Sequence, residues 1–220
     1  MFNLILTLTL MFLNLQQNMP KKILFFGDSI TELGVKENGY ISLMSDRLSK
    51  TKKSEKYQLI GSGIGGNKVY DLFFRMEKDV LTKQPDVVVI WIGVNDVWHK
   101  SMFGTGTDLN KFESMYTGII QRLQKTGTKV YCCTPACIGE KTDHSNAQDG
   151  DLNEYSKVIR KIAAANNTGL IDIRKTFLEY NQKNNTDNLY QGSLTYDGVH
   201  LNDTGNQLVS DLMWDKLIDK

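Results

Sequence analysis

Short runs of consecutive apolar residues alternate along this chain with longer segments in which apolar residues recur every three or four positions. The clearest run, "DVVVIWIG" at 86–93, is typical of a strand buried on both faces. The segment 68–83 instead aligns its apolar residues on one side, which predicts an amphipathic helix. We predict strands at 21–26, 57–60, 86–93, 128–135 and 168–173. We predict helices at 39–50, 68–83, 109–126, 151–167, 174–182 and 203–219.

This alternation of strands and helices predicts a largely parallel sheet covered on both faces, because parallel strands need helical crossovers. No Pro- or Gly-rich linker divides the chain, and no repeat of about 20–50 residues is present. We therefore expect one α/β domain over 20–220, a three-layer α/β/α fold of flavodoxin-like type with a five-stranded, mostly parallel sheet.

The first fifteen residues, "MFNLILTLTLMFLNL", are apolar apart from two Asn and two Thr. This stretch is shorter than the about 20 residues that span a bilayer, so we predict no stable membrane span. Residues 1–18 resemble the core of a signal peptide, which would make the protein secreted or periplasmic. Alternatively they lie upstream of a true start at Met19, and the protein is then cytoplasmic.

The charge and the cysteines exclude several classes of protein. The 26 basic and 25 acidic residues give a net charge of +1, without the basic excess of a nucleic-acid-binding surface. The three cysteines, Cys132, Cys133 and Cys137, form no C-x-x-C motif. We expect Cys132 and Cys133 to pack as small apolar residues at the end of a strand. No spacing of ligand residues predicts a metal, and we expect no cofactor.

Polar residues follow the predicted strands at the edge where an open α/β sheet binds its ligands. Ser29 follows the first strand, Asn95 the third, and the pair Asp197 and His200 precedes the last helix. A serine hydroxyl needs a base to become nucleophilic, and a histidine oriented by a carboxylate is suited to that task. A side-chain amide and the N–H groups of glycines could stabilise the oxyanion that such an attack creates.

Four segments at these positions resemble the signature blocks of the SGNH, or GDSL-type, ester hydrolases. They are "FFGDSIT", "GIGGN", "GVND" and "DGVH", in the order of the family, and the resemblance extends from residue 22 to about 218. The resemblance implies Ser29 as the nucleophile, His200 as the general base and then acid, and Asp197 as its orienting partner.

The resemblance also implies an oxyanion hole made of the Ser29 N–H, the Gly66 N–H and the Asn95 side chain. Gly65 is the alternative glycine donor. The family often has Asn near position 61, where this chain has Gly61, a difference that removes no catalytic group.

The segment "GSGIGG" at 61–66 also has the G-x-G-x-x-G spacing of a dinucleotide-binding loop. That loop normally follows the first strand, however, whereas this one follows the second. The acid expected about 20 residues later should end the next strand, but Asp86 begins it. We therefore expect the glycines to serve an oxyanion.

The predicted substrate is a small or carbohydrate-linked ester of a short acyl group such as acetyl. A lysophospholipase, a thioesterase or an acyltransferase of the same fold is the alternative, and a carbohydrate-binding module is the non-enzymatic one. Trp98 and Phe103 are candidates for either a substrate-facing surface or packing, and His99 for either the rim of the site or the exposed surface. The sequence does not indicate which oligomeric state the protein adopts.

Overall fold

The computed structural model describes residues 19–219, which form five parallel strands and the helices that cover them. The predicted signal peptide at 1–18 lies outside the described residues. The strands are β1 (Lys21–Gly27), β2 (Tyr57–Gly63), β3 (Val87–Trp91), β4 (Lys129–Cys133) and β5 (Gly169–Ile171). The longer helices are α3 (Tyr40–Lys50), α4 (Val69–Asp79), α6 (Leu109–Gln124), α7 (Asp149–Ala165), α8 (Ile173–Asn184) and α9 (Asp203–Leu217).

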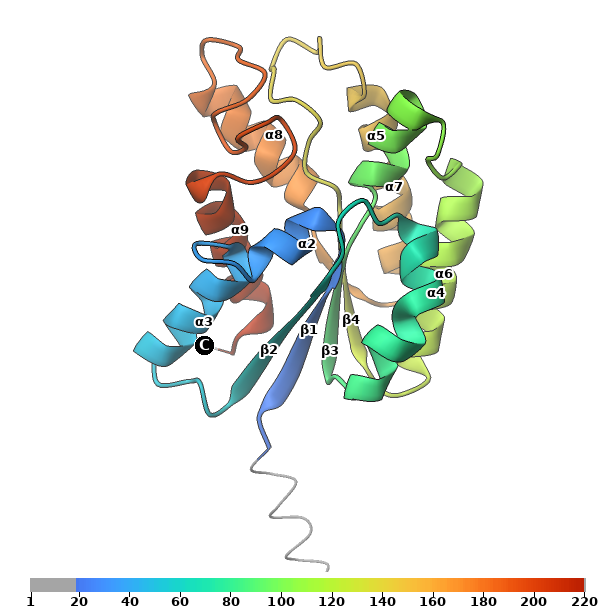
Figure 1. Ribbon diagram of the computed structural model, residues 1–220, viewed down its shortest axis with the longest axis vertical. Helices are drawn as coiled ribbons and strands as arrows, with labels where there is room; N and C mark the ends of the chain where they lie inside the picture. Colours follow the sequence, from blue (N-terminus) through green and yellow to red (C-terminus); the bar gives the residue numbers. More distant parts are fainter. Residues whose placement is uncertain (1–18, 220) are drawn as a thin grey trace, which may run out of the picture.

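The strand order in the sheet is β2-β1-β3-β4-β5, and all four pairings are parallel. Figure 1 shows α3 and α9 on one side of the sheet and α4, α6 and α7 on the other. The three-layer α/β/α fold with a five-stranded sheet is thus confirmed. No helix within residues 19–219 is long and apolar enough to cross a membrane.

Two helices near the ends of strands were not predicted. They are α2 (Ser29–Gly34), which follows β1, and α5 (Val94–Phe103), which follows β3. Each begins at a polar, glycine-containing segment that follows a predicted strand, and no helix was predicted there. In α5 the buried residues lie in the first turn, so the apolar spacing of a long amphipathic helix never develops.

Two predicted boundaries were wrong: the end of the strand that begins at residue 57 and the end of the helix predicted over 68–83. Strand β2 continues to Gly63, so the first half of "GSGIGG" is strand rather than loop. It can do so because each of its residues pairs with β1, as far as Gly63 opposite Gly27. Helix α4 ends at Asp79, and the 3₁₀ helix η1 (Leu81–Lys83) follows in place of the predicted last turn.

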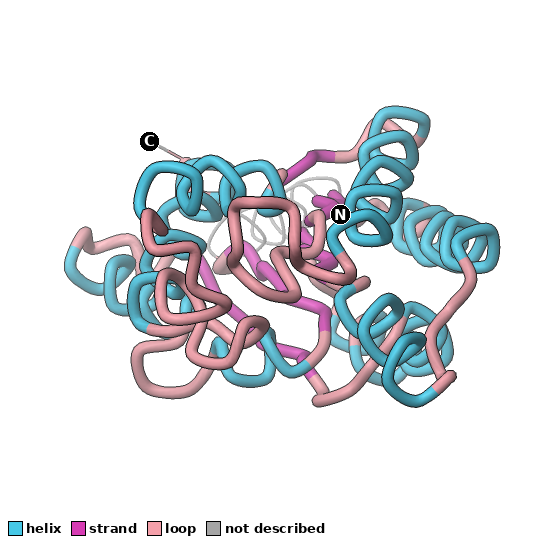
Figure 2. The backbone as a smooth tube through the Cα atoms, turned by 90° about the horizontal axis from the view of Figure 1, so that it is seen from above, coloured by secondary structure: helices cyan, strands magenta, loops and turns pink. Residues whose placement is uncertain are grey.

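The strand order explains where a site can form. The chain passes from β1 outward to β2 and then returns to β3 on the other side of β1. The connections that leave β1 and β3 therefore diverge, and they leave a crevice at the carboxyl ends of these two strands. Viewed from above, loops gather over the strands at this edge (Figure 2). Ser29 and Asn95 follow β1 and β3 and lie at this crevice.

Candidate active site

Three side chains predicted from distant parts of the sequence form one hydrogen-bonded chain. The distance between Ser29 Oγ and His200 Nε2 is 2.9 Å, although the residues are 171 positions apart. On the other side of the imidazole ring, His200 Nδ1 lies 2.7 Å from Asp197 Oδ2. This arrangement can move a proton from the hydroxyl to the imidazole while the carboxylate fixes the ring.

Ser29 is held by a tight packing of β1, β2 and α2. Asp28 caps α2 by accepting a hydrogen bond of 3.0 Å from the Ile30 N–H, so Ser29 is the first residue of the helix. A Cβ atom at Gly63 would lie 2.1 Å from the Glu32 backbone nitrogen, so only glycine lets α2 approach β2 this closely. The serine hydroxyl therefore projects from a rigid turn at the edge of the sheet.

The Asp197 carboxylate orients the loop as well as the imidazole. Its Oδ1 atom accepts hydrogen bonds from the backbone N–H groups of Val199, at 2.9 Å, and His200, at 2.7 Å. Partial burial by itself would raise the pKa of Asp197, but the hydrogen bonds from His200 and from these amides lower it below its usual value. Asp197 consequently remains a carboxylate in mildly acidic solution.

The predicted oxyanion donors lie in segments that contact one another. Asn95 is buried, and its Nδ2 atom donates one hydrogen bond of 3.0 Å to the Asn67 carbonyl oxygen. A second hydrogen remains on that nitrogen. Gly66 has a φ of +74°, a value that favours glycine. A Cβ atom built on Gly65 would lie 4.0 Å from the Ser29 Cβ, so the glycine loop reaches the serine.

The two candidate glycines differ in how their amides are used. The Gly65 N–H donates a hydrogen bond of 2.7 Å to Glu32 Oε2. In the part of the chain that the structure describes, the Gly66 N–H has no such partner. The Gly66 amide is therefore the one available to a ligand.

Two buried carboxyl groups, Asp28 and Asp96, lie next to site residues. Burial, with a smaller contribution from the nearby Asp96, raises the pKa of Asp28 to about 7. Burial also raises the pKa of Asp96 to about 6, although the Val69 N–H donates to this carboxylate at 3.2 Å. Neither side chain belongs to the hydrogen-bonded chain of Ser29, but each directly adjoins a predicted site residue in the sequence, Asp28 next to Ser29 and Asp96 next to Asn95.

Aromatic side chains surround the imidazole. Tyr196 stacks on His200 with the ring centroids 5.7 Å apart, and Trp98 meets the same ring edge-on at 6.5 Å. His99 lies beside Gly66, since a Cβ atom there would be 3.7 Å from His99 Cε1, and exposed Phe103 meets His99 edge-on at 5.2 Å. The structure therefore brings Trp98 and His99 to the site and leaves Phe103 on its outer rim.

Glu140 is a site residue that the sequence analysis missed. It follows β4 and is buried, and its carboxylate accepts hydrogen bonds from the Ser193 N–H and the Leu194 N–H, both at 2.7 Å. It also accepts a hydrogen bond of 2.9 Å from the Thr195 hydroxyl, whose oxygen in turn accepts from the Gly198 N–H at 3.0 Å. One carboxylate thus anchors the loop that contains Asp197 and His200. Its position in the loop that follows β4 was the available signal.

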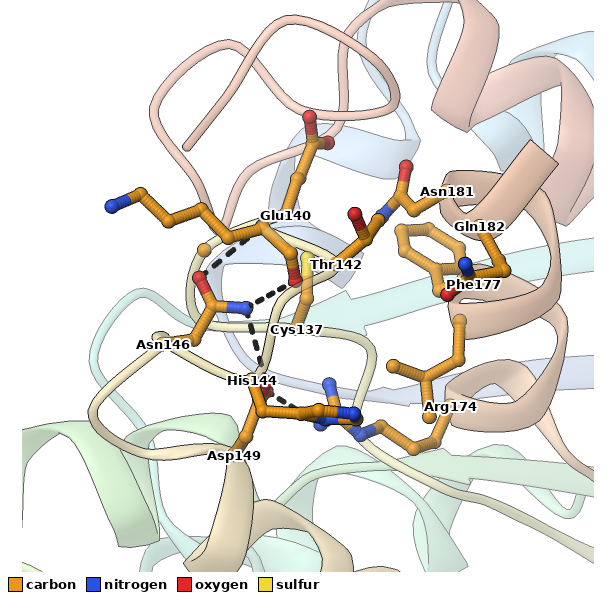
Figure 3. Close-up of a pocket in the computed structure, with 13 residues that line it drawn as sticks. Cys137, Glu140, Thr142, His144, Asn146, Asp149, Arg174, Phe177, Asn181 and Gln182 are labelled. Atoms are coloured by element: carbon orange, nitrogen blue, oxygen red, sulfur yellow. Dashed lines mark hydrogen bonds and ion pairs between the residues drawn. The ribbon is translucent and has the colours of Figure 1, made fainter. Parts of the chain in front are cut away.

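A cavity of about 160 Å³ lies behind this anchored loop (Figure 3). It is lined in part by Arg174 and Asp149, which form an ion pair of 2.6 Å, and by Phe177. Figure 3 shows the Glu140 carboxylate turned away from this pair. Neither Ser29 nor His200 lines the cavity, so it is distinct from the hydrogen-bonded chain. No group of three or more His, Cys, Asp or Glu residues in 19–219 could hold a metal ion.

The comparison with known families decides the identity of the chain. The GDSL-like lipase/acylhydrolase family matches residues 25–208. The chain belongs to this family. The match begins within β1, includes all four signature blocks, and confirms the predicted resemblance.

Individual proteins similar to this chain point to ester hydrolysis. An acetylxylan esterase of Geobacillus stearothermophilus is 27% identical over 208 residues, which cover 86% of this chain and 90% of that protein. An isoamyl acetate-hydrolyzing esterase 1 homolog of Rattus norvegicus is 26% identical, covering 90% of this chain and 82% of that protein. The crystal structure of an acetyl xylan esterase, AlAXEase, matches with a TM-score of 0.89 and 61% identity. It covers 90% of this chain and 100% of that chain.

This GDSL-like protein is therefore a carboxylic ester hydrolase, and the prediction of an enzyme is confirmed. The non-enzymatic alternative, a carbohydrate-binding module, is set aside by the same findings. The glycine segment 61–66 is accordingly part of an esterase.

Proposed function

We propose that this chain is a serine esterase that removes acetyl groups from acetylated carbohydrates through an acyl-enzyme. The observation that supports it most is the hydrogen-bonded chain from Ser29 Oγ through His200 to Asp197, with distances of 2.9 and 2.7 Å. Acetyl as the acyl group is supported by the acetylxylan esterases among the similar proteins, above all the one with 61% identity.

In the proposed mechanism, Ser29 Oγ attacks the ester carbonyl carbon while His200 Nε2 takes the hydroxyl proton. The carbonyl oxygen becomes an oxyanion that accepts hydrogen bonds from the Ser29 N–H, the Gly66 N–H and the Asn95 side chain. The C–O bond to the alcohol then breaks, and His200 gives its proton to the departing alcohol oxygen. Water deprotonated by His200 attacks the acetyl group on Ser29, releasing acetate and restoring the serine.

Two features favour these roles over their alternatives. The Gly65 N–H already donates to Glu32, so Gly66 is the better glycine donor. Ser29 is the first residue of α2, and the first N–H groups of a helix have no partner within it. Both amides are therefore free to bind an oxyanion.

The test is a fluorophosphonate probe together with two serine variants. The probe should label Ser29 in the native chain, and Ser29→Ala should lose both labelling and turnover of p-nitrophenyl acetate. Ser45→Ala, which changes an exposed serine on α3, should keep both. Full activity in Ser29→Ala would refute the mechanism.

The substrate is tested separately from the mechanism. Rates on p-nitrophenyl esters should fall as the acyl chain lengthens from acetyl, and acetylated xylan should release acetate. Acetyl transfer to an added sugar faster than to water would instead indicate an acyltransferase, and a preference for long acyl chains would indicate a lysophospholipase.

A further inference from the structure

We propose that Arg75 is a positioning residue that sets the geometry of the oxyanion hole. The proposal rests on the proposed function, because it concerns the three donors named there. Arg75 lies on α4, outside the four signature blocks, and its side chain is 14% exposed.

All five N–H groups of this guanidinium have acceptors within the protein. One terminal nitrogen donates to the backbone oxygens of Gly27, at 2.8 Å, and Ser62, at 3.0 Å, near the ends of β1 and β2. The other donates to Asp79 Oδ2, at 2.9 Å, and to Ser62 Oγ, at 3.3 Å. Nε donates to Asn67 Oδ1 at 2.7 Å. The group also lies over the Phe26 ring, 4.5 Å from its centroid.

Two of these acceptors, Gly27 and Asn67, lie next to the segments that contain the oxyanion donors. Gly27 precedes Ser29 by two residues, so fixing its carbonyl fixes the turn that presents the Ser29 N–H. Asn67 follows Gly66 directly, and its carbonyl oxygen holds the Asn95 amide at 3.0 Å. A single cation therefore links the strand before Ser29, the loop of Gly66 and, through Asn67, the side chain of Asn95.

Arginine suits this position for a reason of geometry. Its planar fork presents five donors in fixed directions, whereas a lysine ammonium has only three and cannot reach the same set of acceptors. With every N–H directed at a protein acceptor, Arg75 has no donor left for the substrate. It therefore acts through the donors and not on the reacting atoms.

Loss of this alignment should weaken the stabilisation of the transition state. A misplacement of about 1 Å can lower a rate about 100-fold, because oxyanion donors act only at the correct distance. We expect Arg75→Lys to lower kcat on p-nitrophenyl acetate about 10- to 100-fold and to leave KM within about twofold. Affinity for a boronic acid that forms a tetrahedral adduct with Ser29 should fall by a similar factor. The shape of the pH profile should not change, because His200 and Asp197 are untouched.

Arg160→Lys is the matched control. Arg160 lies on α7 and makes a bidentate ion pair with Asp172, at 2.8 and 2.9 Å, away from the three donors. Its replacement should lower the melting temperature without lowering kcat or the boronic acid affinity. If Arg75→Lys behaves as Arg160→Lys does, the proposal is overturned.

A second variant keeps the proposal testable if Arg75→Lys folds poorly. Asn67→Ala removes the Nε acceptor but keeps the carbonyl oxygen that holds Asn95, so it should lower kcat and the boronic acid affinity together by a smaller factor. Unchanged values would refute a role for Arg75 through this loop. Failure of the proposed function gives a different result. In that case Ser29→Ala keeps its activity although Arg75 is intact.

Discussion

Asp28→Asn tests how the burial of a carboxyl group next to a site residue changes stability with pH. The side chain is 2% exposed, and its pKa is raised from 3.8 to about 7 chiefly by burial. Since the folded state holds this proton more tightly than the unfolded chain, the free energy of unfolding falls as pH rises between these values. Asparagine removes the titration and can still accept the Ile30 N–H, so the cap on α2 is preserved.

The size of the effect follows from the two pKa values. A shift from 3.8 to about 7 corresponds to about 4 kcal/mol of unfolding free energy above pH 7, at about 1.4 kcal/mol per pH unit. Part of it is already present at pH 5, so the change between pH 5 and pH 8 is about 2–3 kcal/mol. The free energy of unfolding of Asp28→Asn, relative to that of the native chain, should therefore rise by about 2–3 kcal/mol between pH 5 and pH 8.

Urea unfolding of both proteins at pH 5 and pH 8 measures this difference, because all other titrating groups are shared. Asp46→Asn is the control, since Asp46 is exposed on α3 and its replacement should give an almost constant difference. A stability difference for Asp28→Asn that does not change with pH would show that folding leaves the pKa of Asp28 unshifted. A difference that turns against the variant at pH 8 would show that the folded chain stabilises the Asp28 carboxylate. Either result would refute the reasoning.

Three further substitutions test other parts of the site. Asp197→Asn should lower kcat about 10³–10⁴-fold, since an amide at Nδ1 favours the tautomer of His200 that cannot accept a proton; unchanged turnover of p-nitrophenyl acetate would exclude this role. Asn95→Ala should lower kcat about 10²–10³-fold with little change in KM, whereas an increase in KM alone would indicate ground-state binding. Glu140→Ala should lower the free energy of unfolding by about 3–5 kcal/mol, because it leaves buried donors such as the Thr195 hydroxyl unpaired; a loss below about 1 kcal/mol in urea unfolding would contradict that reasoning.

Much of the fold could be predicted because local patterns record burial. The run 86–93 becomes β3, a strand with every residue buried, and the spacing of 109–126 becomes α6. The short helices α2 and α5 escaped prediction because each begins at a motif rich in polar residues and glycine. The end of α4 also escaped, since the apolar residues continue at helical spacing past Asp79 while the backbone changes to a 3₁₀ turn.

The sequence by itself determined the alternation of strands and helices and the presence of Ser29, Asn95 and His200 at places where strands end or loops precede a helix. It could do so because apolar periodicity and local motifs are properties of neighbouring residues. Only the tertiary structure decided that β1 lies between β2 and β3 and that Ser29 Oγ reaches His200 Nε2 across 171 positions. It also decided the contacts of Arg75, whose long polar side chain is indistinguishable in sequence from one in solvent. Such contacts depend on strand order and on segments that meet only when the sheet is assembled.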